Sequence, residues 1–161
     1  MARSAKQLLN MPIVAIATGK EIGTVQQLIF EPGQHQLYGL VVKRPDKSDP
    51  TLVVRAMNVK SYGDQAITID SQQDATVFDS DERARAIASS PGHLRGVTVL
   101  SEDGNEVGKV DTVIINDAGA IEKYETSGGL LGLGSGKGFA PSQIVSAGED
   151  AIIVRNEALS A

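Results

Sequence analysis

The chain contains no cysteine and no tryptophan among its 161 residues. The absence of cysteine excludes disulfide bonds, thiolate nucleophiles and cysteine-ligated metal sites. Aromatic residues make up only 4% of the chain, so it has few flat side chains on which the bases of single-stranded nucleic acid stack. We therefore expect no cysteine chemistry, and we do not expect nucleic acid as the main partner.

Long apolar runs and paired histidines are also missing. No stretch approaches the roughly 20 apolar residues of a transmembrane helix, and the N-terminus lacks the apolar core of a secretory signal. The two histidines, His35 and His93, are far apart in the sequence, so neither has a second histidine at metal-ligand spacing. We expect a cytoplasmic protein without membrane contact, metal or cofactor, and two surface histidines.

The formal net charge of −5 is spread unevenly. Residues 1–70 carry a net charge of +2, residues 71–95 carry −1, and residues 96–161 carry −6. The acidic second half argues against broad binding to a nucleic-acid backbone. A local basic group in the first half could nevertheless meet an acidic partner or RNA, or it could be a solvated face that protects a sheet edge. This basic group consists of Lys43, Arg44, Lys47, Arg55 and Lys60.

A seven-residue segment occurs twice, as Gly19-Lys-Glu-Ile-Gly-Thr-Val25 and as Gly104-Asn-Glu-Val-Gly-Lys-Val110. The offset between the copies is 85 residues, and it continues to match without a gap beyond the segment. For example, Val14 corresponds to Val99, and Ile67 corresponds to Ile152. A constant offset of this kind indicates an internal duplication, so we predict the same fold twice.

Each copy of the segment has the residues of a hairpin bend. Its structural positions are Gly19, Glu21 and Gly23 in the first copy and Gly104, Glu106 and Gly108 in the second. The first glycine permits the positive φ of a tight bend. The second glycine opens a strand, which indicates a bulge or the close approach of another backbone. The glutamate is interpreted as accepting hydrogen bonds from turn amides; the alternative is a ligand or catalytic carboxylate.

Short apolar runs between turn residues predict strands at residues 13–17, 24–31, 36–43, 51–55 and 66–70. Ser4 and Gln7 have the spacing of a capping box, which predicts a helical turn that ends before Pro12. Acidic residues at 79–82 predict the start of a helix that ends before Pro91. We predict a mostly β protein with two small barrels and short helical lead-ins. The first barrel spans residues 1–70, a connector with a short helix spans 71–95, and the second barrel spans 96–161.

The duplicated pattern resembles the PRC-barrel family, which is named for the cytoplasmic domain of the photosynthetic reaction-centre H subunit. The same fold forms the C-terminal domain of a bacterial ribosome-maturation factor. The resemblance is carried by the two copies of the Gly-x-Glu-Ile/Val-Gly-x-Val segment, by Phe139-Ala-Pro-Ser-Gln-Ile144 and by Gly148-x-Asp-Ala-Ile-Ile-Val154. It implies small β-barrels that act as interaction or regulatory modules and not as enzymes, and it does not identify the partner.

The second copy also contains a glycine-rich segment at residues 127–138, where the first copy differs most. A phosphate-binding loop would need Gly at position 131 and Ser or Thr at 138, but the chain has Leu131 and Gly138. The segment carries Leu130, Leu131 and Leu133, which a purely solvated linker does not need. We expect these leucines to be buried on the same barrel, on a second copy of the chain in a homo-oligomer, or on another protein.

Three functions remain open from the sequence. The preferred one is a non-enzymatic cytoplasmic adaptor that binds an unidentified protein partner. The second is association with ribosomes or RNA-processing machinery through the basic group. The third is binding of a small ligand between the barrels.

Overall fold

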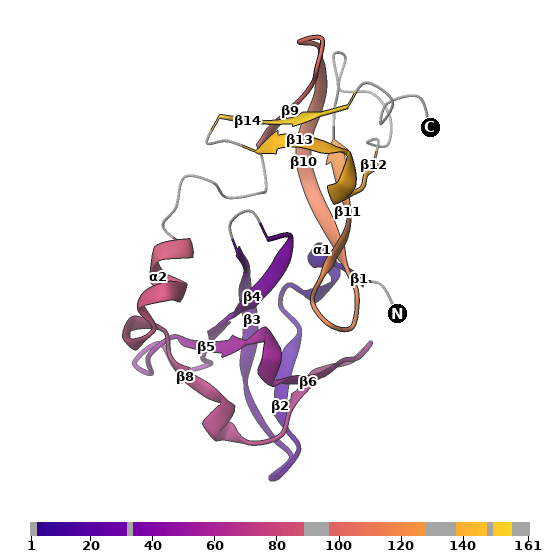
Figure 1. Cartoon of the computed structure of the whole chain (residues 1–161). Helices are drawn as coiled ribbons and strands as arrows, with labels where there is room; N and C mark the ends of the chain where they lie inside the picture. The colour runs from indigo at the N-terminus through magenta and orange to yellow at the C-terminus, as the bar shows by residue number, and fades with distance from the viewer. Residues whose placement is uncertain (1–2, 32–33, 89–96, 128–137, 148–149, 156–161) are drawn as a thin grey trace.

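A computed structural model of the chain describes residues 3–31, 34–88, 97–127, 138–147 and 150–155. The described chain is mostly β, with one sheet for each sequence repeat (Figure 1). The prediction of two tandem β units is therefore confirmed. No helix in these ranges is long and apolar enough to cross a membrane.

The first sheet has seven strands in the order β6-β7-β2-β3-β4-β5-β8. Their bounds are β2 Pro12–Ala15, β3 Lys20–Glu31, β4 Gln36–Lys43, β5 Leu52–Arg55, β6 Val59–Tyr62, β7 Ile67–Ile69 and β8 Ala75–Val77. Strand β8 comes from the predicted connector and pairs with β5. Three 3-10 helices accompany these strands: η1 Ala56–Asn58, η2 Gln72–Asp74 and η3 Phe78–Ser80.

The second sheet repeats this order as β13-β14-β9-β10-β11-β12. Its strands are β9 Thr98–Ser101, β10 Glu106–Ile115, β11 Ile121–Ser127, β12 Gly138–Phe139, β13 Ile144–Ala147 and β14 Ala151–Val154, with η4 at Pro141–Gln143. The parallel pair β2–β7 of the first sheet corresponds to the parallel pair β9–β14. The second sheet also receives β1, Arg3–Ser4, which pairs with β10.

The gap-free offset is wrong for one strand. Opposite Gly23 the first sheet has Ile13, whereas opposite Gly108 the second sheet has Val99. Val99 therefore takes the place of Ile13 and not of Val14. The physical reason is the length of the bend. Ala15 pairs with Lys20, whereas the Ser101 amide bonds to the carbonyl of Asn105, so the second bend is one residue shorter.

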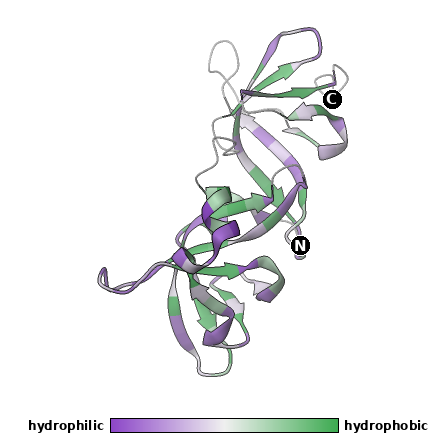
Figure 2. Ribbon diagram, turned by 60° about the vertical axis from the view of Figure 1, so that its left-hand side comes forward, coloured by the Kyte–Doolittle hydropathy of each residue, from purple (hydrophilic) through white to green (hydrophobic). Residues whose placement is uncertain are grey.

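The main hydrophobic core draws on both repeats. Its buried side chains form one continuous cluster that includes Leu40 and Ile67 of the first sheet and Val99, Ile115 and Phe139 of the second. Figure 2 shows that the hydrophobic segments lie mainly along the strands of both sheets. Because a single repeat is short, and small domains have marginal cores, sharing buried surface stabilises both.

The two helices cover different parts of the molecule. Helix α2, Glu82–Ala88, places Ala84 and Ile87 over a second apolar cluster on the first sheet that contains Ile29, Val41 and Val53. Because strand β4 is covered on both faces, its residues 40–42 are all buried. Helix α1, Ala5–Leu8, begins with the predicted capping box of Ser4 and Gln7 and ends before Pro12.

Candidate functional site

The β3–β4 and β10–β11 hairpins of the two repeats meet at their tips. Gln36 pairs with Ala120 in an isolated antiparallel bridge. The Leu37 amide donates to the Gly119 carbonyl, and the Ile121 amide donates to the His35 carbonyl, each at 2.8 Å. At the 85-residue offset, Ala120 is the counterpart of His35, and Ile121 is the counterpart of Gln36. The same positions of the two repeats thus face each other reciprocally, as in a two-fold dimer interface built into one chain.

Side chains add to this junction. The Nδ1 atom of His35 lies 2.7 Å from the Tyr124 hydroxyl oxygen, and the two rings meet edge to face. Tyr124 also stacks on Phe139, with ring centroids 5.2 Å apart. The prediction of a surface histidine is wrong for His35, which is half-buried between the repeats. His93 lies outside the described residues.

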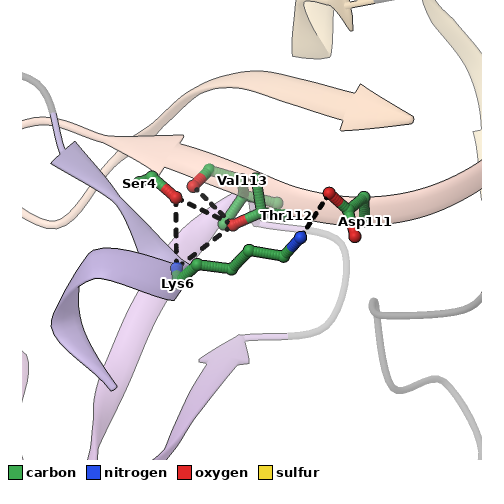
Figure 3. Close-up of polar contacts among 5 residues, drawn as sticks. All are labelled: Ser4, Lys6, Asp111, Thr112 and Val113. Atoms are coloured by element: carbon green, nitrogen blue, oxygen red, sulfur yellow. Dashed lines mark hydrogen bonds and ion pairs between the residues drawn. The ribbon is translucent and has the colours of Figure 1, made fainter. Parts of the chain in front are cut away.

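The N-terminal segment also crosses to the other repeat (Figure 3). Thr112 of β10 lies 3.2 Å from the Ser4 hydroxyl oxygen, and its own hydroxyl oxygen accepts a bond from the Lys6 amide at 3.3 Å. The ammonium of Lys6 forms an ion pair with Asp111 at 2.5 Å. Leu8, at the end of α1, is fully buried in the shared core. The first residues of the chain therefore clasp the second sheet.

The glycines of the repeated segment have the geometry expected of them. Gly19 and Gly104 have positive φ, 69° and 88°. A Cβ on Gly23 would lie 2.4 Å from the Lys43 carbonyl oxygen, so the β4 backbone leaves no room for a side chain. Gly108 has a φ of 150°. In both sheets the register shifts immediately before the second glycine, which is the β-bulge that the sequence indicated.

The glutamates of this segment do not stabilise the bend as expected. Glu21 and Glu106 are exposed, and in the described part of the chain neither carboxylate accepts a hydrogen bond. Other side chains cap the bends instead. The Thr18 hydroxyl accepts from the Lys20 amide, and the Ser101 hydroxyl accepts from the Asn105 amide. Because each glutamate begins a strand and points to solvent, it lies beyond the amides of the bend.

The structure divides the predicted basic group. Lys43, Arg44 and Lys47 lie at one end of the β4–β5 hairpin, where Arg44 approaches Asp49 at 3.8 Å. Arg55 lies at the other end, because it is opposite Gly39 in the ladder. Lys60 is exposed on the far edge strand β6. These residues therefore do not gather on a single face along the sheet order.

Arg55 belongs instead to a network around Asp81. The Asp81 carboxylate accepts bonds from the Tyr38 hydroxyl and the Ala84 amide, and it pairs with Arg55 at 3.4 Å. Arg55 also lies over the Tyr38 ring. Burial alone would raise the pKa of Asp81, but the bonds from Ala84 and Tyr38 and the charge of Arg55 together hold this pKa below its usual value. The network fixes the start of α2 on the first sheet.

The remaining predicted residues give no site within the described ranges. Leu130, Leu131 and Leu133 lie outside the described residues. Across the part of the chain that the structure describes, no three His, Asp or Glu side chains gather in a way that could hold a metal ion. The alternative in which Glu21 and Glu106 act as ligands thus gains no neighbouring acid or histidine there.

Exposed apolar side chains are a feature that the sequence reasoning missed. Met57 of η1 is 82% exposed, and Ile16, after β2, is 54% exposed. Both lie at one end of the first barrel. The Ile16 amide donates to the carbonyl of Ile69, Ile69 pairs with Val59, and Met57 precedes Val59 by two residues. We call Ile16 and Met57 the apolar end.

The second repeat lacks an equivalent of the apolar end. Met57 corresponds to Ser142, and Ile16 corresponds in the structure to Glu102, because β9 is shifted by one residue. Both of these polar residues are exposed. The fold therefore accepts polar residues at these positions, and packing does not require Ile16 and Met57 to be apolar. A comparison of the two copies in the sequence could have found the Met57–Ser142 difference.

Comparison with known proteins agrees with the duplicated fold. The family model of the PRC-barrel domain matches residues 2–75 and 92–159. The two matched segments contain the two sheets and together cover most of the chain. No curated protein matches the chain.

Proposed function

The chain belongs to the PRC-barrel family and carries its domain twice, and from this premise we propose that it is a non-enzymatic cytoplasmic adaptor that binds a protein partner. The partner docks on the apolar end of the first barrel. The supporting observation is the exposure of Met57, at 82%, in a position where the second repeat has a serine. A large apolar side chain held at the surface by a regular element is typical of an interaction site.

The size of the apolar end indicates a transient complex. Burial of an apolar side chain of this size stabilises a complex by about 1.5–3 kcal/mol. Ile16 and Met57 together therefore contribute roughly 3–6 kcal/mol before the cost of association is subtracted. We expect a partner that presents an apolar side chain to this end and is released readily.

The experiment compares partner recovery by variants that copy the second repeat. Wild-type protein, Met57→Ser and Ile16→Glu are each crosslinked in a native lysate, and the recovered proteins are quantified. Both variants should lose the same specific protein. Val77→Ser removes another partly exposed apolar side chain from β8, away from the apolar end, and should retain that protein.

Other outcomes would contradict this proposal. If all three variants recover the same proteins as the wild type, the apolar end is not a docking site. If recovery instead depends on RNA, it should be abolished by nuclease and fall steeply with salt concentration. Stabilisation by a small molecule, seen as a rise in Tm that Met57→Ser does not affect, would point to ligand binding.

A further inference from the structure

Strand β13 is an edge strand without charge. Among the described strands it pairs only with β14, which matches Ile144, Ser146 and Ala147 to the strand beside them. Val145 is passed over by a bulge in this ladder and is 51% exposed. The four residues of β13 are Ile-Val-Ser-Ala, so no Lys, Arg, Asp or Glu protects this edge.

The corresponding edge of the first sheet is protected. Strand β6 has the same bulge, between Val59 and Ser61, but the bulged residue there is the exposed Lys60. A lysine on an edge strand is one of the ways in which proteins prevent edge-to-edge pairing, because a second sheet would have to bury its charge. The two repeats therefore share the backbone of this edge and differ in whether it can accept another strand.

Opposite charges mark the two ends of the β13–β14 hairpin. Asp150 comes directly before β14, at the end of the hairpin where Ala147 lies. Arg155 comes directly after β14, and its amide donates to the Gln143 carbonyl at 2.9 Å, next to Ile144. Both side chains are exposed. At the 85-residue offset, the first repeat has Gln65 and Asp70 in these places, so this arrangement of charges belongs to the second repeat.

We propose that β13 pairs with β13 of a second copy of this chain, antiparallel and around a two-fold axis. Antiparallel pairing brings the Asp150 end of each hairpin to the Arg155 end of the other. It also places the two Val145 side chains near the axis, where they lose contact with water. Such an interface is self-complementary and closes at two chains. The bulge shortens the ladder of hydrogen bonds, so the dimer is weak and depends on protein concentration.

The charges also favour this occupant over the other uncharged edge of the chain. Strand β8 carries no charge, but Asp74 precedes it and Asp79 follows shortly after it. Pairing of β13 with β8 would bring an acidic residue close to Asp150 in either direction. It would also be head to tail, and such contacts form open chains unless the rotation closes a ring.

The test is the mass of the full chain by sedimentation equilibrium over a range of protein concentrations. The wild type should reach twice the monomer mass of 16.9 kDa. Val145→Lys, which copies the residue of the first repeat, should raise the dimer Kd by at least about tenfold, equivalent to roughly 1.4 kcal/mol. Its Tm should not change, because Lys60 occupies the same bulge in β6. Ser61→Lys adds the same charge to β6 and should leave the mass unchanged.

Charge exchange tests the two-fold geometry. Asp150→Arg and Arg155→Asp should each weaken the dimer, because each brings like charges together. The double variant Asp150→Arg/Arg155→Asp should restore it, because the two ends are then complementary again. Met57→Ser should not affect the mass, so failure of the proposed adaptor function and failure of this dimer can be distinguished.

Three results would overturn the proposal. The first is a wild-type chain that remains monomeric at every concentration. The second is a dimer that withstands Val145→Lys, which would place the interface elsewhere; loss of that dimer on replacement of Leu130, Leu131 and Leu133 by Ser would place it in the glycine-rich segment. The third is a double charge variant that is as weak as the single variants.

Discussion

The Nδ1 atom of His35 and the hydroxyl oxygen of Tyr124 lie 2.7 Å apart and join the two repeats where their hairpins meet. This contact has no symmetric counterpart. At the 85-residue offset, Tyr124 corresponds to Gly39 and His35 corresponds to Ala120. A side chain cannot be added at Gly39, because its Cβ would lie 2.7 Å from the Val54 carbonyl oxygen. The junction therefore combines a reciprocal backbone pairing with one side-chain bond that exists only once.

We predict that the His35–Tyr124 bond stabilises the fold. Tyr124→Phe removes the hydroxyl and should lower the free energy of unfolding by about 0.5–1.5 kcal/mol. Urea unfolding of Tyr124→Phe, His35→Ala and the double variant measures the coupling between the two residues. Free-energy losses that simply add would show that the bond contributes nothing.

Alkaline pH should destabilise the protein through its buried tyrosines. Burial, with a smaller contribution from the charge of Asp117, raises the pKa of Tyr62 to about 12, and burial raises the pKa of Tyr124 to about 12. In the unfolded chain a tyrosine has a pKa of about 10. The unfolded state therefore ionises first, so stability is fully present below pH 10 and is lost as the pH rises toward 12.

The expected loss is roughly 2–3 kcal/mol for each of these two tyrosines across that window. It is measured as the urea midpoint against pH. Tyr62→Phe and Tyr124→Phe should each make the curve flatter, because a phenylalanine does not ionise. A wild-type midpoint that stays constant from pH 9 to 12 would be inconsistent with the raised pKa values.

Gly23 should tolerate substitution much less well than Gly19. Gly23→Val places a side chain against the Lys43 carbonyl oxygen and should cost more than about 1 kcal/mol of stability. Gly108→Val should also exceed about 1 kcal/mol, because a β-branched residue does not adopt a φ of 150° readily. Gly19→Asn is the matched control. No atom approaches within 4 Å there, and asparagine accepts a φ of 69°. Equal melting temperatures for Gly19→Asn and Gly23→Val would refute the close approach.

The network around Asp81 should hold α2 on the first sheet. Asp81→Asn weakens the bonds to Tyr38 and Ala84 and removes the ion pair with Arg55. The expected cost at neutral pH is about 1–3 kcal/mol. The nearby Asp79 is exposed, so Asp79→Asn should change the stability little.

The pH dependence gives a second measure of this network. The pKa of Asp81 is lowered in the folded state, so its contribution is present above the unfolded pKa of about 3.9 and is lost as the pH falls through the folded value. The stability difference between wild type and Asp81→Asn should therefore be full at pH 6 and shrink below about pH 4. A difference that is the same at pH 6 and pH 2.5 would argue against the network.

The sequence predicted those features that depend on local pattern. The matched segments around Gly19 and Gly104 predicted the duplication, and the apolar run at residues 36–43 predicted β4 with the bounds that the structure has. Glycine at positions 23 and 108 predicted the bulge, because a missing side chain is a local signal of backbone geometry. The capping box of Ser4 and Gln7 likewise depends on residues three positions apart.

Contacts between distant parts of the chain could not be predicted in this way. Nothing near Ser4 or Thr112 indicates that the N-terminal segment packs on the second sheet, since both are ordinary polar residues that gain a partner only in the folded chain. Arg55 was grouped with other basic residues because they are close in sequence, but the ladder places it at the far end of its hairpin, beside Asp81. The shift of Val99 relative to Val14 comes from one residue less in a bend, which the high similarity of the flanking segments concealed.

Hydrogen exchange of second-repeat amides in Gly23→Val tests most directly whether the two repeats form one unit. Val99 and Ile152 are buried and belong to the core that both repeats share, whereas the substitution lies in the first sheet. If the repeats unfold together, the amides of Val99 and Ile152 should exchange faster in the variant, by about tenfold for each 1.4 kcal/mol of lost stability. Unchanged protection of these amides, with faster exchange confined to the first sheet, would show that the repeats are independent domains.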